Sequence, residues 1–332
     1  MNGDFEPDAQ LRDHITALCA GDDSGQEAVE TAARARPEAM RPFHAALIDA
    51  GVIMWPWLPV WLAATEQTAA RIVELVDTDR ADAGQWLLAL GSSRTRTAAE
   101  AMRRWTAEPP PVAEKLHVPV GRYAHEGGWE LGPGGEVSPL TSLAAYELVP
   151  TDGETSVAGS VPLGQVCRLC GLELLRRLDV DLDDPALADL GLAGHGRVVA
   201  VTCVHCGGYT DYLGEYRPDG TASGSGHNTR PANLRLAGPN DYAMPTERLG
   251  LGARRATPVG GIAWEAGGST LGGLPDWIQD AAYPTCPSCE TTMYFLAMVT
   301  GDDLWGDIAE GCDYIFFCAA DCGITCVVYQ QS

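Results

Sequence analysis

Apolar residues recur every three or four positions through much of residues 8–107, a spacing that places them on one face of a helix. Two sequences of the capping-box type, which begin at Ser24 and Thr97, indicate helix starts because their side chains satisfy free N–H groups there. Short helices joined by short turns predict stacked hairpins resembling irregular HEAT repeats, with a plain helical bundle as the alternative. The main apolar repeats lie at 11–18, 38–50, 66–77 and 82–91.

The pattern changes at Glu108. Three consecutive prolines follow it and predict a stiff, extended linker over residues 108–114. Beyond the linker, glycine and proline become frequent, and short runs of β-branched or aromatic residues, at 116–120, 197–202 and 314–317, indicate strands. We therefore expect an α+β multidomain protein, with a helical repeat domain over residues 1–107 and a β-rich part after the linker.

Eight of the eleven cysteines fall into four close pairs. A C-x-x-C pair places two thiolates on one tight turn, and two such turns complete a tetrahedral four-cysteine zinc site. We expect two structural Zn2+ ions, in closed sites that stabilise the fold and leave no position for a substrate. The expected ligands are Cys167, Cys170, Cys203 and Cys206 in the first site, and Cys286, Cys289, Cys318 and Cys322 in the second.

The cysteine pairs divide the β-rich part into two zinc units, residues 115–240 and 241–332, whose similar order indicates an internal duplication. Residues 215–240 are rich in Gly, Ser, Pro and Asn and are expected to form a long exposed loop between the units. Gly207 and Gly323, which follow the second pairs, are expected to take the positive φ that such turns often need.

Three cysteines lie outside this scheme. Cys326 is an alternative ligand to Cys322, although a strand over 324–329 would carry it away from the turn. Cys19 is expected in a helical core, and Cys312 is expected to bind no metal.

The cysteines also bear on the compartment. Eleven cysteines without a recognisable secretory signal favour a reducing interior, so a cytoplasmic location is expected. A disulfide framework is the alternative, but the C-x-x-C spacing favours metal. No stretch approaches the roughly 18 apolar residues that a membrane span needs.

The net charge of −23 is unevenly distributed. Residues 115–332 carry 27 acidic and 12 basic side chains, and after Arg255 there are ten acids and no Lys or Arg. Phosphate backbones and anionic membranes are bound through Lys and Arg, so the charge argues against nucleic acid and membrane as partners. A basic partner protein is the expectation.

Motifs for catalysis are missing from the sequence. None of the seven histidines belongs to an H-E-x-x-H or H-x-E site, and neither a phosphate-binding P-loop nor a G-x-S-x-G elbow is present. We therefore predict no catalytic residue and favour a binding role over catalysis. A hydrolase with an unrecognised active site is the rival class, and a scaffold subunit of a larger complex is a third.

One candidate binding patch combines an aromatic segment with an acidic loop. Alternation places Trp277 and Gln279 on one face of an expected short strand, where Trp277 either covers the core or serves as a recognition anchor. Asp302, Asp303 and Asp307 lie in the variable loop between the cysteine pairs of the second unit.

The segment Gly272-Gly-Leu-Pro-Asp-Trp-Ile-Gln279, followed by Cys286-Pro-Ser-Cys289 and Met293-Tyr-Phe-Leu296, resembles the YwqG-like family of unknown function. The same phrases are similar to those of the programmed-cell-death-2 proteins, which also duplicate their cysteine pairs. The match covers about residues 258–330, and Ala297-Met298 stands where the family often has Gln.

This resemblance implies binding rather than catalysis. YwqG-like proteins resemble immunity or protein-binding modules, and programmed-cell-death-2 proteins look like dedicated chaperones of a basic ribosomal protein. Neither family transfers a catalytic residue to this chain.

Overall fold

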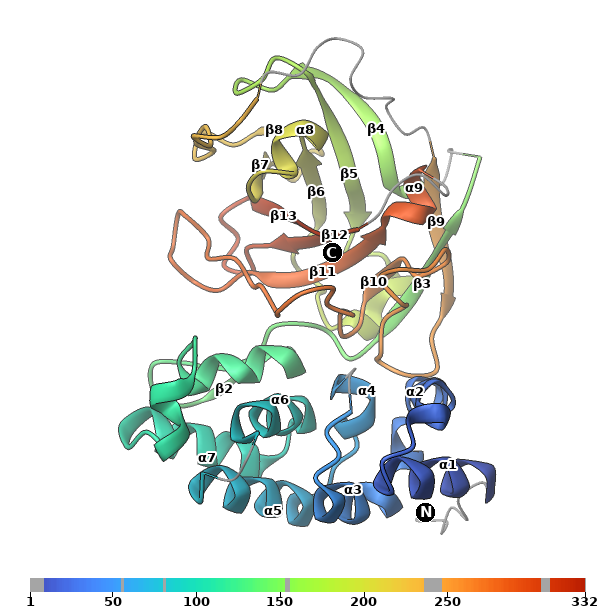
Figure 1. Cartoon of the computed structure of the whole chain (residues 1–332). Coiled ribbons are helices and arrows are strands. Elements are labelled where there is room, and N and C mark those ends of the chain that lie inside the picture. The colour runs from blue at the N-terminus through green and yellow to red at the C-terminus, as the bar shows by residue number, and fades with distance from the viewer. Residues whose placement is uncertain are drawn as a thin grey trace. The chain divides into compact units, whose positions relative to one another are not determined.

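The structure is a computed structural model that describes residues 9–54, 57–79, 82–152, 156–235, 247–305 and 311–331. It divides into two compact units, Met1–Pro139 and Leu140–Ser332. Helices form most of the first unit, and a large antiparallel sheet forms most of the second (Figure 1). The protein is therefore of mixed α+β class, as expected.

The first unit contains α-helices and 3-10 helices and ends in a two-stranded ribbon. The α-helices are α1 Ala9–Cys19, α2 Gln26–Ala35, α3 His44–Ala50, α4 Trp57–Trp61, α5 Glu66–Asp77, α6 Ala83–Ser93 and α7 Arg96–Ala107. The 3-10 helices are η1 Asp23–Gly25, η2 Pro37–Phe43, η3 Pro111–Lys115 and η4 Val120–Gly127, and the ribbon is β1 Trp129–Leu131 with β2 Val137–Pro139.

Threonine side chains cap two of these helices. The Oγ1 atoms of Thr65 and Thr95 accept hydrogen bonds at 3.1 Å from the backbone N–H groups of Thr68 and Ala98. The capping boxes predicted at Ser24 and Thr97 are wrong, because Thr97 already lies inside α7, and Asp22 caps η1. The capping residue is the one with extended backbone directly before the helix. The spacing of apolar residues does not define the start of a helix closely enough to identify that residue.

The helical unit extends past the predicted proline-rich linker over 108–114. Val112 is buried in its core within η3, so this segment is not an extended spacer. Trp129 is also buried there, and its indole N–H donates to the Gly91 carbonyl at 2.8 Å. A Cβ on Gly91 would lie 1.9 Å from the Tyr123 carbonyl oxygen, so glycine permits η4 to pack on α6.

The second unit is built on one sheet of eleven strands in the order β6-β5-β4-β9-β3-β10-β11-β12-β13-β7-β8. Every neighbouring pair is antiparallel. The strands are β3 Ala145–Pro150, β4 Ser156–Val166, β5 Glu173–Asp181, β6 Arg197–Thr202, β7 Tyr212–Tyr216, β8 Ala222–Gly224, β9 Arg248–Arg254, β10 Thr270–Gly272, β11 Tyr294–Thr300, β12 Cys312–Phe317 and β13 Ile324–Gln330. Short helices η5 Pro185–Leu190, α8 Val204–Gly207 and α9 Gly301–Trp305 lie in the connections.

The expected strands at 197–202 and 314–317 correspond to β6 and β12, whereas 116–120 forms no strand. Strands from the two expected zinc units are interleaved, because β7 pairs with β13 and β3 pairs with β10. The boundary at 240/241 therefore does not separate two sheets. The start of the expected exposed loop over 215–240 instead forms the β7–β8 hairpin.

The sheet curls, so that its first strand approaches its far end. A Cβ on Gly214 of β7 would meet the Val201 backbone nitrogen of β6 at 3.2 Å, and the Thr325 hydroxyl lies 3.4 Å from the Val199 carbonyl oxygen. Among the described residues, no helix is long and apolar enough to cross a membrane.

Candidate metal centres

The first four-cysteine group lies beside the end of β4, the start of β5 and the end of β6. Cys167 and Cys170 lie on the β4–β5 connection. After β6, Cys203 directly precedes α8 and Cys206 lies within it. Their sulfur atoms all lie within 4.8 Å of one another. The Cys167–Cys206 and Cys170–Cys203 Sγ distances are 3.7 and 3.4 Å.

These distances fit a metal site better than a disulfide. Four sulfurs at about 2.3 Å from a tetrahedrally bound ion lie about 3.8 Å from one another, whereas a disulfide needs about 2.05 Å. All eleven cysteines are free thiols in the structure. A soft four-thiolate donor set suits Zn2+ and related thiophilic ions.

Backbone hydrogen bonds shape the first cysteine turn. The N–H of Cys167 donates to the Leu172 carbonyl at 2.7 Å, and the N–H of Gly171 donates to the Cys167 carbonyl at 2.8 Å. The N–H of Leu169 donates to the Cys167 sulfur at 3.4 Å. Gly171 has φ of 82°, which glycine adopts without a side-chain penalty.

The pKa values of the cysteines in the first group indicate which thiols a bound cation would have to ionise. A hydrogen bond with Cys203 lowers the pKa of Cys167 to about 4, against the effect of burial, and the Tyr212 hydroxyl donates to the same sulfur at 3.5 Å. The hydrogen bond to Cys167 and burial raise the pKa of Cys203, and burial raises the pKa of Cys206. The surroundings thus favour ionisation of Cys167 and oppose that of Cys203 and Cys206, and a bound cation would supply the charge that ionises these two.

The second group repeats this arrangement. The sulfurs of Cys286, Cys289, Cys318 and Cys322 lie within 4.8 Å of one another, with Cys289 and Cys318 3.5 Å apart. The N–H of Cys286 donates to the Thr291 carbonyl at 2.8 Å, and that of Glu290 donates to the Cys286 carbonyl at 2.9 Å. These are the same two hydrogen bonds as in the first turn. A hydrogen bond with the Thr291 hydroxyl lowers the pKa of Cys289 to about 6.

The structure thus brings together all eight cysteines predicted from the spacing, in two groups that are possible metal sites. Cys326, the alternative ligand, lies buried within β13 and belongs to neither group. Cys312 begins β12 and is buried outside both groups, and Cys19 ends α1.

Only one of the two glycines predicted to have positive φ does so. Gly323 has φ of 66°, beside Asp321 with φ of 57°. Gly207 ends the short helix α8 and has ordinary helical geometry, so the prediction for it is wrong. A C-x-x-C that lies at a helix start needs no left-handed residue at that point.

Trp277 is a core residue in the structure rather than a surface anchor. Its side chain is 8% exposed and stacks on Tyr314 with the ring centroids 4.5 Å apart. The expected strand through Trp277 and Gln279 is absent. Instead the Tyr314 hydroxyl donates to the Asp276 carbonyl at 2.6 Å and accepts from the Ile278 N–H at 3.0 Å, which holds this segment in an irregular conformation.

The rest of the candidate binding patch is scattered. Exposed Gln279 donates from its backbone N–H to Gln330 Oε1 at 3.0 Å and is tied to the end of β13. Asp303 accepts from the N–H groups of Gly267 and Ser269 at 2.6 and 3.1 Å, so its carboxylate fixes a loop. Asp302 is half-buried in α9, and Asp307 lies outside the described residues.

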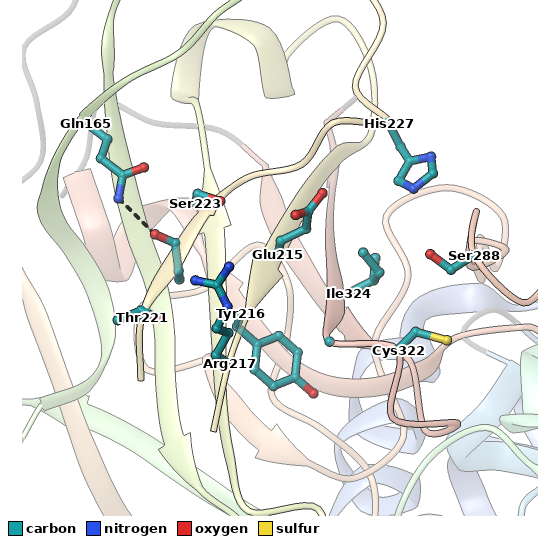
Figure 2. Close-up of a pocket in the computed structure, with 12 residues that line it drawn as sticks. Gln165, Glu215, Tyr216, Arg217, Thr221, Ser223, His227, Ser288, Cys322 and Ile324 are labelled. Carbon is teal, nitrogen blue, oxygen red and sulfur yellow. Dashed lines mark hydrogen bonds between the residues drawn. The ribbon is translucent and has the colours of Figure 1, made fainter. Parts of the chain in front are cut away.

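A cavity that sequence reasoning missed lies beside the second cysteine group. It measures about 480 Å3 and is lined by Gln165 of β4, Glu215 of β7, Ser288 and Cys322, which Figure 2 shows around one opening. The Gly226 N–H and Ser225 hydroxyl donate to Glu215 and lower its pKa, so this carboxylate orders the neighbouring turn. The lining comes from separated segments, so no local motif marks it.

Comparison with known proteins finds a relative without an assigned activity. The chain is 31% identical over 266 residues to the uncharacterized protein YpfL of Salmonella typhimurium, an alignment that spans 79% of this chain and 62% of the relative. The chain thus covers less than two thirds of the relative's length. No protein-family profile matches the chain. No solved structure matches it either.

Proposed function

We propose that the chain is a zinc-stabilised protein-binding factor, of an immunity or chaperone-like type, that acts on a basic partner in the cytoplasm. Each four-cysteine group would hold one Zn2+ through four thiolates, which leaves no open coordination position. This donor set supports a structural role for the ions, because a catalytic zinc keeps a site for water or substrate.

Charge is the observation that carries the binding proposal. Residues 140–332 hold 24 acidic and 10 basic side chains. Four of the acids are exposed at the end of β5 and in the β5–β6 connection, at Asp181, Asp183, Asp184 and Asp189. A field of this sign accelerates encounter with Lys- and Arg-rich surfaces and disfavours acidic ones.

The resemblance to YwqG-like and programmed-cell-death-2 proteins supports the same proposal, since both families point to binding. The matching hydrogen bonds at Cys167 and Cys286 support an internal duplication of the cysteine turns. The succession of short helices in the first unit supports a HEAT-like arrangement, which would give the protein a second contact surface.

The test begins with the full chain purified without chelator. Elemental analysis should find about two zinc ions per chain. The same material, used as bait in an extract of its native host, should retain a basic protein at low salt. Retention of an acidic protein, or of DNA or RNA after basic proteins are removed, would overturn the proposal.

A further inference from the structure

Four arginines line one small cavity of the sheet-bearing unit. They come from three neighbouring parts of the sheet: Arg176 and Arg177 from β5, Arg197 from β6 and Arg248 from β9. The cavity measures about 240 Å3. Residues 140–332 contain only ten basic side chains, so four of the ten gather at one place in an otherwise acidic unit.

Irregular strand pairing brings the two adjacent arginines to this cavity. Successive side chains of a regular strand point to opposite faces, so Arg176 and Arg177 would be expected to separate. The pairing of β5 with β6 shifts register between Arg176 and Leu178, and the pairing with β4 shifts between Ala158 and Val161. Such bulges re-aim side chains and are frequent beside functional sites.

Gly159 allows the fourth arginine to approach. It has φ of 141°, and a Cβ there would lie 2.7 Å from the Glu247 carbonyl oxygen and 3.0 Å from the Arg248 Cα. A larger residue would push β9 away from the bulge in β4. The neighbouring Ser160 hydroxyl accepts from Arg177 Nη1 at 2.5 Å, so the same irregular segment also fixes a second guanidinium.

Two carboxylates, Asp179 and Asp313, hold three of the arginines in place. Asp179 accepts from Arg197 at 2.7 and 2.8 Å and also from Arg176. Burial opposes the ionisation of Asp179, but the hydrogen bonds of these two arginines outweigh it and lower its pKa. Arg177 is 2% exposed and pairs with Asp313 at 2.8 Å.

Asp179 is shared by the guanidinium groups of Arg176 and Arg197, and the charge of Asp181 also acts on Arg197. Within the described part of the chain, the buried Nε–H of Arg176 also finds no acceptor. Positive charge gathered in a partly enclosed site is costly unless an anion joins it. The ion pairs order the guanidiniums in advance, which reduces the entropy that a ligand would lose on fixing them.

We propose that this cavity binds a phosphoryl-type oxyanion, either inorganic phosphate or the terminal phosphate of a small molecule. Guanidinium groups match phosphate oxygens with paired N–H donors, and an anion is the complement to positive side chains gathered from three strands. Sites for drug-sized ligands are about 300–1,000 Å3, so this cavity has room for one such group rather than a whole nucleotide.

Calorimetric titration of the full chain tests the proposal. Inorganic phosphate and free phosphoserine are titrated separately, with acetate and sodium chloride at the same ionic strength as references. We expect saturable binding of phosphate and none of acetate. Binding of phosphoserine as well would identify a phosphate ester as an acceptable source, and binding of inorganic phosphate alone would identify the free ion.

Arg248→Gln and Arg176→Gln should each weaken phosphate binding about tenfold or more, since each removes a charge-assisted hydrogen-bond donor. Arg254→Gln is the matched control, because Arg254 lies on β9 too but pairs with Asp189 outside this cavity. It should leave the affinity unchanged. Melting curves without ligand verify that each variant is folded.

The proposal is overturned if phosphate produces no more heat than sodium chloride, or if acetate binds as well as phosphate. It is also overturned if folded Arg248→Gln and Arg176→Gln retain wild-type affinity, or if Arg254→Gln loses as much as they do. None of these outcomes depends on the zinc content or on a protein partner.

Discussion

Gly171 and Glu290 hold the same place in the two cysteine turns. Each follows the second cysteine of a C-x-x-C pair, each has positive φ (82° and 61°), and each donates its N–H to the carbonyl of the first cysteine. Glycine takes this conformation freely, whereas a residue with a side chain pays roughly 1–2 kcal/mol for it. The second turn therefore stores strain that the first does not.

Introducing glycine into the second turn and removing it from the first should have opposite effects on the stability of the protein. Glu290→Gly should raise the free energy of unfolding by about 0.5 kcal/mol, the relief of strain less the extra entropy of glycine in the unfolded chain. Gly171→Ala should lower it by about 1 kcal/mol through the backbone alone, because a Cβ there meets nothing within 4 Å. Chemical denaturation of both variants checks the signs, and a loss of stability in Glu290→Gly would contradict the strain argument.

Replacing a cysteine of a four-cysteine group should destabilise the protein far more than replacing a buried cysteine outside both groups. Cys289→Ser should lose one of the two metal ions and much of the stability of the second turn, since metal binding in such modules contributes on the order of 10 kcal/mol. Cys312→Ser should keep both ions and cost about 1–3 kcal/mol for a buried hydroxyl.

Elemental analysis and thermal melting of the two variants are the measurements. Cys326→Ser is a further control, because Cys326 is buried in β13 outside both groups. Equal metal content in Cys289→Ser and Cys312→Ser would sink the assignment of ligands.

The cysteine groups were predictable because their signal is local. Two thiols three or four residues apart share one turn whatever the rest of the fold does. The spacing named all eight members, with Cys326 left open as an alternative to Cys322. The sheet was less predictable, because its pairing is long-range. Gly214 pairs with Thr325, more than 100 residues later, and no short pattern in either strand records that choice.

Other misses came from local patterns that tertiary contacts override. Trp277 alternates with Gln279 as a strand would, but stacking on Tyr314 and hydrogen bonds to its hydroxyl fix a different backbone. The prolines after Glu108 suggested a spacer, but Val112 is buried against the helices. The arginine cavity depends on bulges in two strands, which sequence periodicity does not reveal.

The boundary between the units leads to a prediction about fragments. The sequence predicts a domain boundary in the linker over residues 108–114, whereas the first compact unit ends at Pro139 and the second begins at Leu140. A fragment of residues 1–139 should fold alone. One that ends at Ala107 loses the buried Val112 and Trp129, and the tryptophan alone contributes about 3–5 kcal/mol.

Circular dichroism and thermal melting of the two fragments compare them directly. A fragment of residues 140–332, purified with zinc, is the companion that should also fold. If the chain ending at Ala107 melts as cooperatively and at the same temperature as residues 1–139, the assignment of η4 and β1 to the helical core is wrong.

A buried histidine should make the helical unit sensitive to acid. Burial lowers the pKa of His44 to about 4, although the hydrogen bond between its Nε2 and the Val60 carbonyl, 2.8 Å long, opposes the shift. The folded-state pKa lies below the unfolded value of about 6.5, so the unfolded chain binds more protons between these values. Stability is full above about pH 6.5 and falls by about 3 kcal/mol as the pH drops to about 4.

Proton NMR titration of the His44 ring in the full chain measures this pKa. Urea denaturation of the wild type and of His44→Gln at pH 7 and 5 then isolates the contribution of the histidine from that of the cysteine thiolates, which both proteins share. The difference between the free energies of unfolding of the two proteins should be smaller at pH 5 than at pH 7. A ring that titrates near 6.5 would remove the basis for the prediction.

The acidic β5–β6 connection should control how fast a basic partner associates. Asp183 accepts from the Gly194 N–H at 2.6 Å, and Asp184 accepts from the Ala186 N–H at 2.9 Å, so both carboxylates also have local structural roles. Asn retains an acceptor oxygen, so Asp183→Asn with Asp184→Asn removes charge while it preserves these bonds. The doubly substituted chain should associate with the captured partner roughly two- to tenfold more slowly at low salt, with little change in dissociation.

Salt supplies the internal control for this last prediction. Surface plasmon resonance at low and at 1 M salt compares the two proteins on the same immobilised partner, and the Debye length at 1 M is only about 3 Å. At 1 M salt the electrostatic steering by the aspartates would be screened, so the association rates of the wild type and the variant should become equal. A deficit of the variant that persists at 1 M salt would mean that the aspartates make direct contacts or that the loop has changed shape, and the steering argument would be wrong.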